Sequence, residues 1–493
     1  MAADIADNAD GGRLQVRQAA QVCAACKSRK KKSDKALPSC GYCVRKGLNC
    51  IYEPRPRDDA RENTSSGYIG NTISISSPLA SQHVILFEPG ATEANLYRQV
   101  LHLIRQTGQF VDDISARYFQ GIHRYLPFSS RSRFHESLIT LGVIPSAGFS
   151  ALLLSICVAT SSLRSPNSRP FDRQSLYLTA KSFLAQIQAS YPPSLDLIQA
   201  RLLLAVHDYT CGRPDEAFDA IAGCTRMAYA TGLHLHFNKN HTLHTTTSNI
   251  LKGREAANTW WGIIICERIF FCEVTVLDQP LVTVIPNEDV ILPTEPEVLE
   301  LAEFQGYGLS PDVPVSNLES VNIGGFGRAA QAAWLLDQVL DSFKIQSLDT
   351  KLNQLEALDS TFQNFLGVLM QQSGGKVGKF CEAVAITIRA LFTLHWHIPS
   401  QLQHVEHSTN PSLEGWSSRS DVALDTATKM VLDIIDAHDA LDITAPTYSF
   451  IVQAALKYVR GKPSWNDDAW LRGAEERLRT SLDEFNRNLD MST

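Results

Sequence analysis

The sequence predicts a mainly α-helical protein in which a small cysteine-rich module precedes a large all-α domain. Three observations support this prediction: cysteines gathered near the N-terminus, a polar stretch after them, and a helical period of apolar residues beyond it. With 493 residues, 44% of them hydrophobic, the chain can bury a substantial core. Residues 1–22 carry neither a secretory nor a transit signal, so they are predicted to be a disordered N-terminus of an intracellular protein.

Five cysteines in two Cys-x-x-Cys pairs and one further position define the module, which spans residues 23–50. They are Cys23, Cys26, Cys40, Cys43 and Cys50. A segment this short and polar cannot fold by burying apolar surface, so it needs disulfides or a metal. Cys-x-x-Cys places two thiolates at about the separation that tetrahedral zinc requires, and a second pair completes the shell. The sequence therefore predicts a zinc-binding module.

The other six cysteines are scattered through apolar surroundings. This distribution is typical of small core residues in a reducing compartment rather than of disulfide bridges or nucleophiles. They are Cys157, Cys211, Cys224, Cys266, Cys272 and Cys381.

The cysteine spacing resembles that of the fungal binuclear zinc cluster, a six-cysteine DNA-binding module. Five of the six family cysteines match without a gap, and the third falls on Ser33. The resemblance implies two zinc ions that share six thiolates, with Cys23 and Cys40 bridging both. Because a serine hydroxyl is a poor zinc ligand beside thiolates, the second zinc is expected to be weak or absent.

The resemblance also implies which residues hold each zinc. One ion would keep a full shell of Cys23, Cys40, Cys43 and Cys50. The other would have Cys23, Cys26 and Cys40, with the fourth place left to water, the Ser33 oxygen or the Asp34 carboxylate.

Basic residues lie where DNA binding would need them, in the segment that the family folds as a short helix entering the major groove. By resemblance Arg29 and Lys30 occupy base-reading positions, where they can meet the O6 and N7 acceptors of guanine. Phosphate contacts are expected from Lys27, Lys31, Lys32, Arg45 and Lys46. Pro38 matches the proline of the family's loop. The same charges could instead form a nuclear-import signal or a solvated basic face, and import could use them as well.

The charge distribution separates this module from the rest of the chain. Residues 23–57 hold ten Lys and Arg against Asp34 and Glu53, a net charge of +8, whereas the whole chain carries −7. The remainder therefore carries −15. A basic module on an acidic body indicates that only the first seventy residues or so contact nucleic acid.

Residues 51–90 read as a flexible linker. Pro54, Pro56, a charged cluster and two Ser- and Thr-rich stretches give this segment little capacity to form a core. No sustained apolar heptad runs through it, so the sequence gives no support for dimerisation through the linker.

Residues 91–493 are predicted to form one all-α regulatory domain. Ala217, Ile221, Cys224 and Ala228 are spaced 4, 3 and 4 apart, as on one helix face, and Gly232 follows where the helix should stop. The region from about 95 to 300 resembles the regulatory middle region of the same fungal family. The matching stretches are Tyr209 to His234, Thr259 to Arg268, Gln279 to Leu281 and Pro286 to Pro293.

Three features of this domain invite other interpretations. The apolar run from Trp260 to Val276 is short for a bilayer span and carries charges, so a buried core helix is predicted and no membrane partner. Glu267 and Arg268 are adjacent, and are expected not to face each other on a helix. The run from Gly324 to Arg328 lacks the Gly-Lys-Ser/Thr ending of a phosphate loop, and no catalytic motif is found, so no enzyme is predicted.

The sequence as a whole predicts a nuclear, zinc-dependent, sequence-specific regulator of genes transcribed by RNA polymerase II. By resemblance the genes form a metabolic or biosynthetic set, and the helical domain receives a signal from a metabolite or a protein partner. The alternative is an interaction protein or co-regulator whose degenerate zinc module no longer binds DNA.

Overall fold

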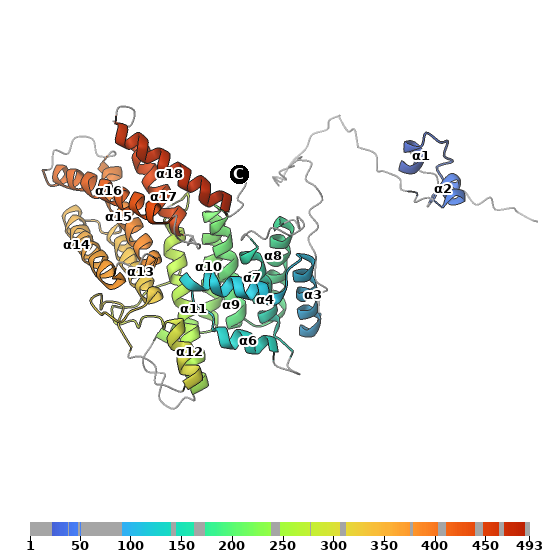
Figure 1. Ribbon diagram of the computed structural model, residues 1–493, viewed down its shortest axis with the longest axis horizontal. Helices are drawn as coiled ribbons and strands as arrows, with labels where there is room; N and C mark the ends of the chain where they lie inside the picture. The colour runs from blue at the N-terminus through green and yellow to red at the C-terminus, as the bar shows by residue number, and fades with distance from the viewer. Residues whose placement is uncertain are drawn as a thin grey trace, which may run out of the picture. The chain divides into compact units, whose positions relative to one another are not determined.

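The computed structural model of the chain divides into two compact units, residues 1–78 and 79–493, which are described separately (Figure 1). The described residues are 22–37, 39–47, 50, 91–139, 144–161, 173–237, 247–276, 278–305, 312–374, 378–402, 411–438, 447–462 and 468–488. The predicted N-terminal tail up to residue 21, the linker at 51–90 and Pro38 lie outside them.

The first unit contains two short helices, α1 (Ala24–Ser28) and α2 (Gly41–Lys46), which contact each other. Among its described residues, the buried side chains are those of four cysteines, with Val22, Ala25, Tyr42 and Cys50 packed against them. This described part therefore has almost no hydrocarbon core.

The second unit is built of helices, as predicted, and contains no β-strand among its described residues apart from an isolated bridge between Ile291 and Pro314. The helices are α3 (Glu93–Gln106), α4 (Val111–Gln120), α5 (Ile122–Tyr125), α6 (Arg131–Ile139), α7 (Ala147–Thr160), α8 (Arg173–Ser190), α9 (Leu195–Thr210), α10 (Pro214–Ala230), the 3-10 helix η1 (Leu233–Phe237), α11 (Thr247–Phe271), α12 (Pro296–Gln305), α13 (Gly325–Ser342), α14 (Leu348–Ser373), α15 (Cys381–Leu402), α16 (Pro411–His438), α17 (Thr447–Gly461) and α18 (Ala469–Asn488).

Helix α7 is the centre of the N-terminal half of this unit. Nearly all its residues are buried, because its sequence is apolar on every side, and it packs against α3, α4, α8 and α9. The Ser146 hydroxyl begins the helix by accepting the N–H of Phe149 at 3.0 Å. Helix α10 packs on the far end of this group, against α9.

The predicted face of α10 is confirmed. Ala217, Ile221, Cys224 and Ala228 all have an exposed fraction of 0%. The helix begins at Pro214 and ends before Gly232, whose φ of +72° lies in the left-handed region that favours glycine.

Helix α11 joins the two halves of the unit, because it contacts α9 and α10 on one side and α13 on the other (Figure 1). Trp260 and Trp261 are fully buried in it, as expected of a core helix. The helix ends at Phe271, five residues before the predicted limit at Val276. No described helix is long and apolar enough to cross a membrane.

The C-terminal half is arranged around α15, which contacts α13, α14, α16 and α17, and α18 packs on α17. In α18 the residues Leu471, Ala474 and Leu478 are buried, so this helix packs through one face, whereas Trp470 is exposed.

Candidate metal centre and nucleic-acid interface

Each Cys-x-x-Cys pair forms the first turn of a helix. Cys23 is the residue that precedes α1 and Cys40 the residue that precedes α2, both with extended backbone. Their carbonyls accept the N–H groups of Lys27 at 2.9 Å and Val44 at 3.1 Å. Residues three apart on a helical turn share one face, so each turn presents two thiols to the other.

Four thiols meet in the space between these turns. The Sγ atom of Cys23 lies 3.7 Å from those of Cys40 and Cys43, and Cys26 Sγ lies 3.6 Å from Cys40 and 3.9 Å from Cys43. All four atoms lie within 4.8 Å of one another and are buried. Zinc bound tetrahedrally at about 2.3 Å holds its sulfurs about 3.8 Å apart. The chemistry and spacing of these donors therefore fit zinc.

Cys50 lies outside this group of four. Its Sγ atom accepts the backbone N–H of Cys40 at 3.2 Å, and the residue is half-buried. The sequence placed Cys50 in the complete shell and Cys26 in the incomplete one. In the structure Cys26 also lies beside Cys43, and the Cys50 thiol hydrogen-bonds to the thiols of Cys23, Cys40 and Cys43.

Ser33 faces the thiol group. A hydrogen bond from its hydroxyl to the Cys40 sulfur is the main cause that lowers the pKa of Cys40 from 9.0 to about 6. The same Ser33 oxygen accepts the N–H of Lys35 at 3.1 Å. The hydroxyl thus stands beside one of the expected bridging thiols.

Asp34, the alternative ligand expected beside Ser33, has another role. Its two carboxylate oxygens each lie 3.1 Å from the backbone N of Gly41, at the start of α2, and one also accepts the N–H of Ala36. The N–H of Gly41 lowers the pKa of Asp34 more than any other group. Asp34 therefore caps α2, a role that no local sequence signal indicates because seven residues separate it from the helix.

The predicted DNA-binding residues are exposed, and the run from Lys27 to Lys32 is called the cationic strip below. Lys27, Arg29, Lys30, Lys31, Lys32, Arg45 and Lys46 are all exposed. Only Lys27 lies within α1, since that helix ends at Ser28, and the residues from Arg29 to Lys35 form a turn and an irregular segment after it. Arg45 and Lys46 lie in the last turn of α2.

Lys30 has an unusual backbone conformation. Its φ of +51° lies in the left-handed region, and Lys35 is the other described non-glycine residue with positive φ, at +57°. This conformation costs a side chain with a Cβ roughly 1–2 kcal/mol. No sequence signal indicates this conformation, because lysine is not a residue that marks left-handed turns.

The pair Glu267 and Arg268, expected not to face each other, is in direct contact within the helical unit. Arg268 Nη1 lies 2.6 Å from Glu267 Oε2, and the two side chains are 1% and 0% exposed. Arg268 also donates to Asp337 at 2.6 Å and to the Thr283 hydroxyl at 2.7 Å. Both long side chains bend toward Thr283, and this shared partner overcomes their divergent directions on the helix.

The glycine-rich run from Gly324 to Arg328 lies at the start of α13. Its backbone N–H groups bind the carboxylate of Glu295, in the place where a phosphate loop would bind phosphate. Glu295 accepts the N–H of Gly327 at 2.8 Å and that of Phe326 at 3.4 Å. A Cβ on Gly324 would lie 2.3 Å from the Glu295 carboxyl carbon, so a larger residue there would have to displace the Glu295 carboxylate. This arrangement caps the helix and agrees with the prediction that the run is a helix entry.

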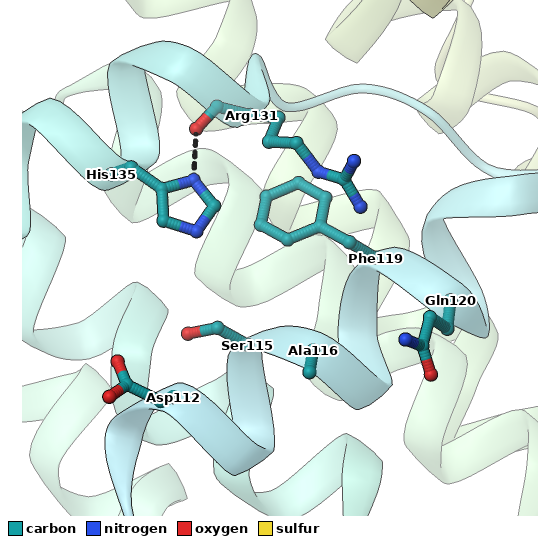
Figure 2. A pocket seen from close by; sticks show the side chains of 7 residues that line it. All are labelled: Asp112, Ser115, Ala116, Phe119, Gln120, Arg131 and His135. Carbon is teal, nitrogen blue, oxygen red and sulfur yellow. Dashed lines mark hydrogen bonds between the residues drawn. The ribbon is translucent and has the colours of Figure 1, made fainter.

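A surface hollow of about 470 Å³ lies between α4 and α6 (Figure 2). The Arg131 guanidinium lies 4.9 Å from the centre of the Phe119 ring, and the His135 ring stacks on the same residue with centres 5.6 Å apart. Asp112 and Gln120 lie at opposite ends of the hollow (Figure 2). The polar groups that line this hollow do not converge on one point. The groups of a catalytic site would converge.

Two family models match the chain. Residues 21–59 match the fungal Zn(2)-Cys(6) binuclear cluster domain, and residues 116–275 match the fungal specific transcription factor domain. The chain is also 28% identical over 124 residues to the transcription factor BOA15 of Botryotinia fuckeliana (strain B05.10), an alignment that covers 25% of this chain and 68% of that protein.

These matches agree with the fold and with the four neighbouring thiols. The cluster domain is a zinc-binding and DNA-binding module, and its combination with the helical domain suggests a nuclear protein. The alternative of a co-regulator without DNA binding is not favoured by them. The comparisons support a fungal, DNA-binding transcription regulator with a zinc-binding module, and this domain architecture is that of a non-enzymatic regulator.

Proposed function

We propose that this protein is a sequence-specific regulator of RNA polymerase II genes that acts in the nucleus and controls a metabolic or biosynthetic gene set. Residues 23–50 form its DNA-binding module, 51–90 its linker and 91–493 its regulatory domain, with the family's middle region at about 95–300. The observation that carries the proposal is the exposed cationic strip that directly follows a buried group of four thiols.

The metal ligands come from the frame of five cysteines, in which Ser33 stands at the third family position. Bound zinc would cross-link the two helical turns, which lack the apolar surface to hold each other. The chain contributes thiolates from both turns, the Ser33 hydrogen bond to Cys40 and the Asp34 cap on α2. Together these groups fix where the cationic strip lies.

Arg29 and Lys30 read guanine in the proposed complex. They lie just beyond α1, where exposed side chains can reach base edges in the major groove. Lys30 keeps its side chain at a backbone position that favours glycine, which is expected of a residue retained for binding. The neighbouring cations neutralise phosphates without reading sequence: Lys27, Lys31, Lys32, Arg45 and Lys46.

The regulatory domain receives the signal in this proposal, from a metabolite or from a protein partner. Its two halves share α11, so a ligand that shifts the helices of one half would also shift those of the other. The domain also carries the chain's acidic excess, which keeps it away from the DNA backbone.

Binding of the full chain to short duplexes, measured by fluorescence anisotropy at several salt concentrations, tests the proposal. A duplex with guanine-containing half-sites should bind more tightly than a random duplex of equal length. Arg29→Ala should lose most of that preference, by about 1–3 kcal/mol. Lys32→Ala should weaken both duplexes equally and reduce the salt slope by about 1.

The matched control is Arg419→Ala, which removes an exposed arginine from α16 in the regulatory domain. It should leave both affinities unchanged. Equal affinity of the unaltered chain for the two duplexes would instead support the co-regulator alternative.

A further inference from the structure

The hollow between α4 and α6 has the size and the lining of a small-molecule site. Its volume of about 470 Å³ lies within the range of about 300–1,000 Å³ that is usual for ligand pockets. Phe119, which is 4% exposed, gives it an aromatic wall. Polar side chains from both helices surround that wall at separate points, an arrangement that suits the different parts of one bound molecule (Figure 2).

Arg131 is the cation of this hollow, and its guanidinium has no acidic partner among the described residues. The guanidinium lies over the Phe119 ring, 4.9 Å from its centre. Stacking on an aromatic ring holds this planar group in place and leaves its N–H donors open to a ligand. Arg133 on the same helix differs, because it pairs with Asp196 at 3.0 Å and with Glu255 at 2.6 Å.

The position of Arg131 in its helix is electrostatically unfavourable unless an anion is near. It is the first residue of α6, at the positive end of the helix dipole, and the first turn contains no acidic residue. Burial is the main cause that lowers the pKa of His123 to about 4, and the charge of Arg131 lowers it further. The positive charge therefore reaches a buried neighbour. An anion in the hollow would neutralise this charge.

His135 provides a second group for recognition. Its ring stacks on Phe119, and its Nδ1 atom lies 2.7 Å from the backbone carbonyl oxygen of Arg131. Because a carbonyl oxygen only accepts, Nδ1 carries the proton, and Nε2 of the neutral ring is an acceptor. Figure 2 shows Arg131 and His135 on one wall of the hollow, with Ser115 and Ala116 of α4 on the other.

We propose that this hollow binds a small molecule with a flat apolar body, whose single carboxylate or phosphate group pairs with Arg131 and whose body lies along Phe119. Both anions match the planar fork of an arginine, which can donate two parallel hydrogen bonds to either. The carboxylate of Asp112 at one end of the hollow disfavours a second anionic group. The inference rests on the proposed function in one respect, since it makes this molecule the signal that the regulatory domain receives.

Binding of benzoate to the full chain tests the inference, because benzoate has one carboxylate on a flat ring. Saturation-transfer NMR detects weak binding, and a titration at constant ionic strength gives the Kd. Benzoate should bind, whereas benzamide, its neutral counterpart, and benzylamine, its cationic counterpart, should not. Phenyl phosphate is the second anionic probe. Whichever of the two anions binds more tightly identifies the anionic group that the hollow prefers.

Two variants and one control locate the binding. Arg131→Gln should weaken benzoate binding about tenfold or more, because a charged hydrogen-bond donor is lost. Ala116→Trp should abolish binding by filling the hollow while Arg131 stays in place. Arg105→Gln is the matched control, since it removes an exposed arginine from the last turn of α3, outside the hollow, and should leave the Kd unchanged. Circular dichroism checks that each variant keeps its helices.

Three results would overturn the inference: no binding of either anion to the unaltered chain, an unchanged Kd in Arg131→Gln, or tighter binding of benzylamine than of benzoate. Duplex binding on the same samples separates this failure from failure of the function. Guanine preference without anion binding would remove the site and leave the regulator intact. Anion binding that depends on Arg131, without duplex preference, would do the reverse.

Discussion

Arg268 donates a hydrogen bond to Glu267, its neighbour in the chain, across 2.6 Å in the interior of the helical unit. Thr283 joins the pair, since its hydroxyl accepts from Arg268 and donates to Glu267. Glu267 also accepts the N–H groups of Val282 and Thr283. The loop after α11 is thereby attached to the helix by charged groups that are fully removed from water.

Arg268→Met should destabilise the helical unit strongly. It leaves the carboxylates of Glu267 and Asp337 without their cation, and breaking a buried pair by removing one partner costs about 3–5 kcal/mol. Urea unfolding of the full chain, followed by tryptophan fluorescence, measures the change. The control is Arg419→Met, whose pair with Glu356 is more than half exposed on both sides and should contribute less than about 1 kcal/mol. A similar loss in both variants would contradict this assignment.

Glu295 should make the stability of the helical unit depend on pH. Burial is the main cause that raises the pKa of Glu295 from 4.5 to about 7, so folding favours its protonated form. Its contribution is fully present below pH 4.5 and is lost as the pH rises through 7, by at most about 3 kcal/mol.

Glu295→Gln tests this pH dependence and keeps an oxygen for the N–H of Gly327. The difference in unfolding free energy between the variant and the unaltered chain should grow in favour of the variant from pH 5 to pH 8. Glu382, whose pKa burial also raises to about 7, is present in both proteins and cancels in that difference. A difference that stays constant with pH would show that Glu295 does not titrate in this range.

Ser33→Cys should raise the metal content of the module. The substitution would supply the sixth thiol that the resemblance implies, beside Cys40, where the Ser33 hydroxyl lies now. Zinc counting on the full chain should rise from one to two ions, and Co²⁺ absorption should double. A matched Ser28→Cys variant adds a thiol at the end of α1 and should leave the count at one.

Lys30→Gly should separate folding of the module from its binding to DNA. Glycine adopts the φ of +51° at Lys30 without strain, so zinc retention against a competing chelator should be unchanged or improved. Affinity for a guanine-containing duplex should fall about tenfold, because a base contact is lost.

The control for this prediction is Lys35→Gly, which relieves the same backbone strain at φ +57° outside the proposed contact set. It should keep the duplex affinity. Equal loss of affinity in both glycine variants would mean that the backbone conformation, rather than the Lys30 side chain, matters for binding.

The parts of this fold that depend on local periodicity could be predicted from the sequence. The buried face of α10, its end before Gly232 and the core helix α11 all follow from spacing within one segment. Two Cys-x-x-Cys turns likewise predict neighbouring thiols, because each motif is closed within four residues.

The contacts that depend on distant partners could not be predicted. Glu267 and Arg268 meet through Thr283, Glu295 caps a helix that begins thirty residues later, and Asp34 reaches α2 across a loop. The contact of Cys26 with Cys43 has the same origin. Spacing shows which thiols lie on one turn, whereas the packing of one turn on the other decides which four converge.

The absence of a hydrocarbon core in the described part of the first unit makes its folding conditional. Four sulfur atoms stand where aliphatic side chains would normally be buried, and few apolar side chains pack against them there. Oxidants that join those sulfurs in disulfides, or a shortage of zinc, would therefore unfold the DNA-binding module. The regulatory domain would stay folded. The occupancy of target promoters would then fall when the cell is oxidised or short of zinc. This fall would not depend on any signal that the regulatory domain receives.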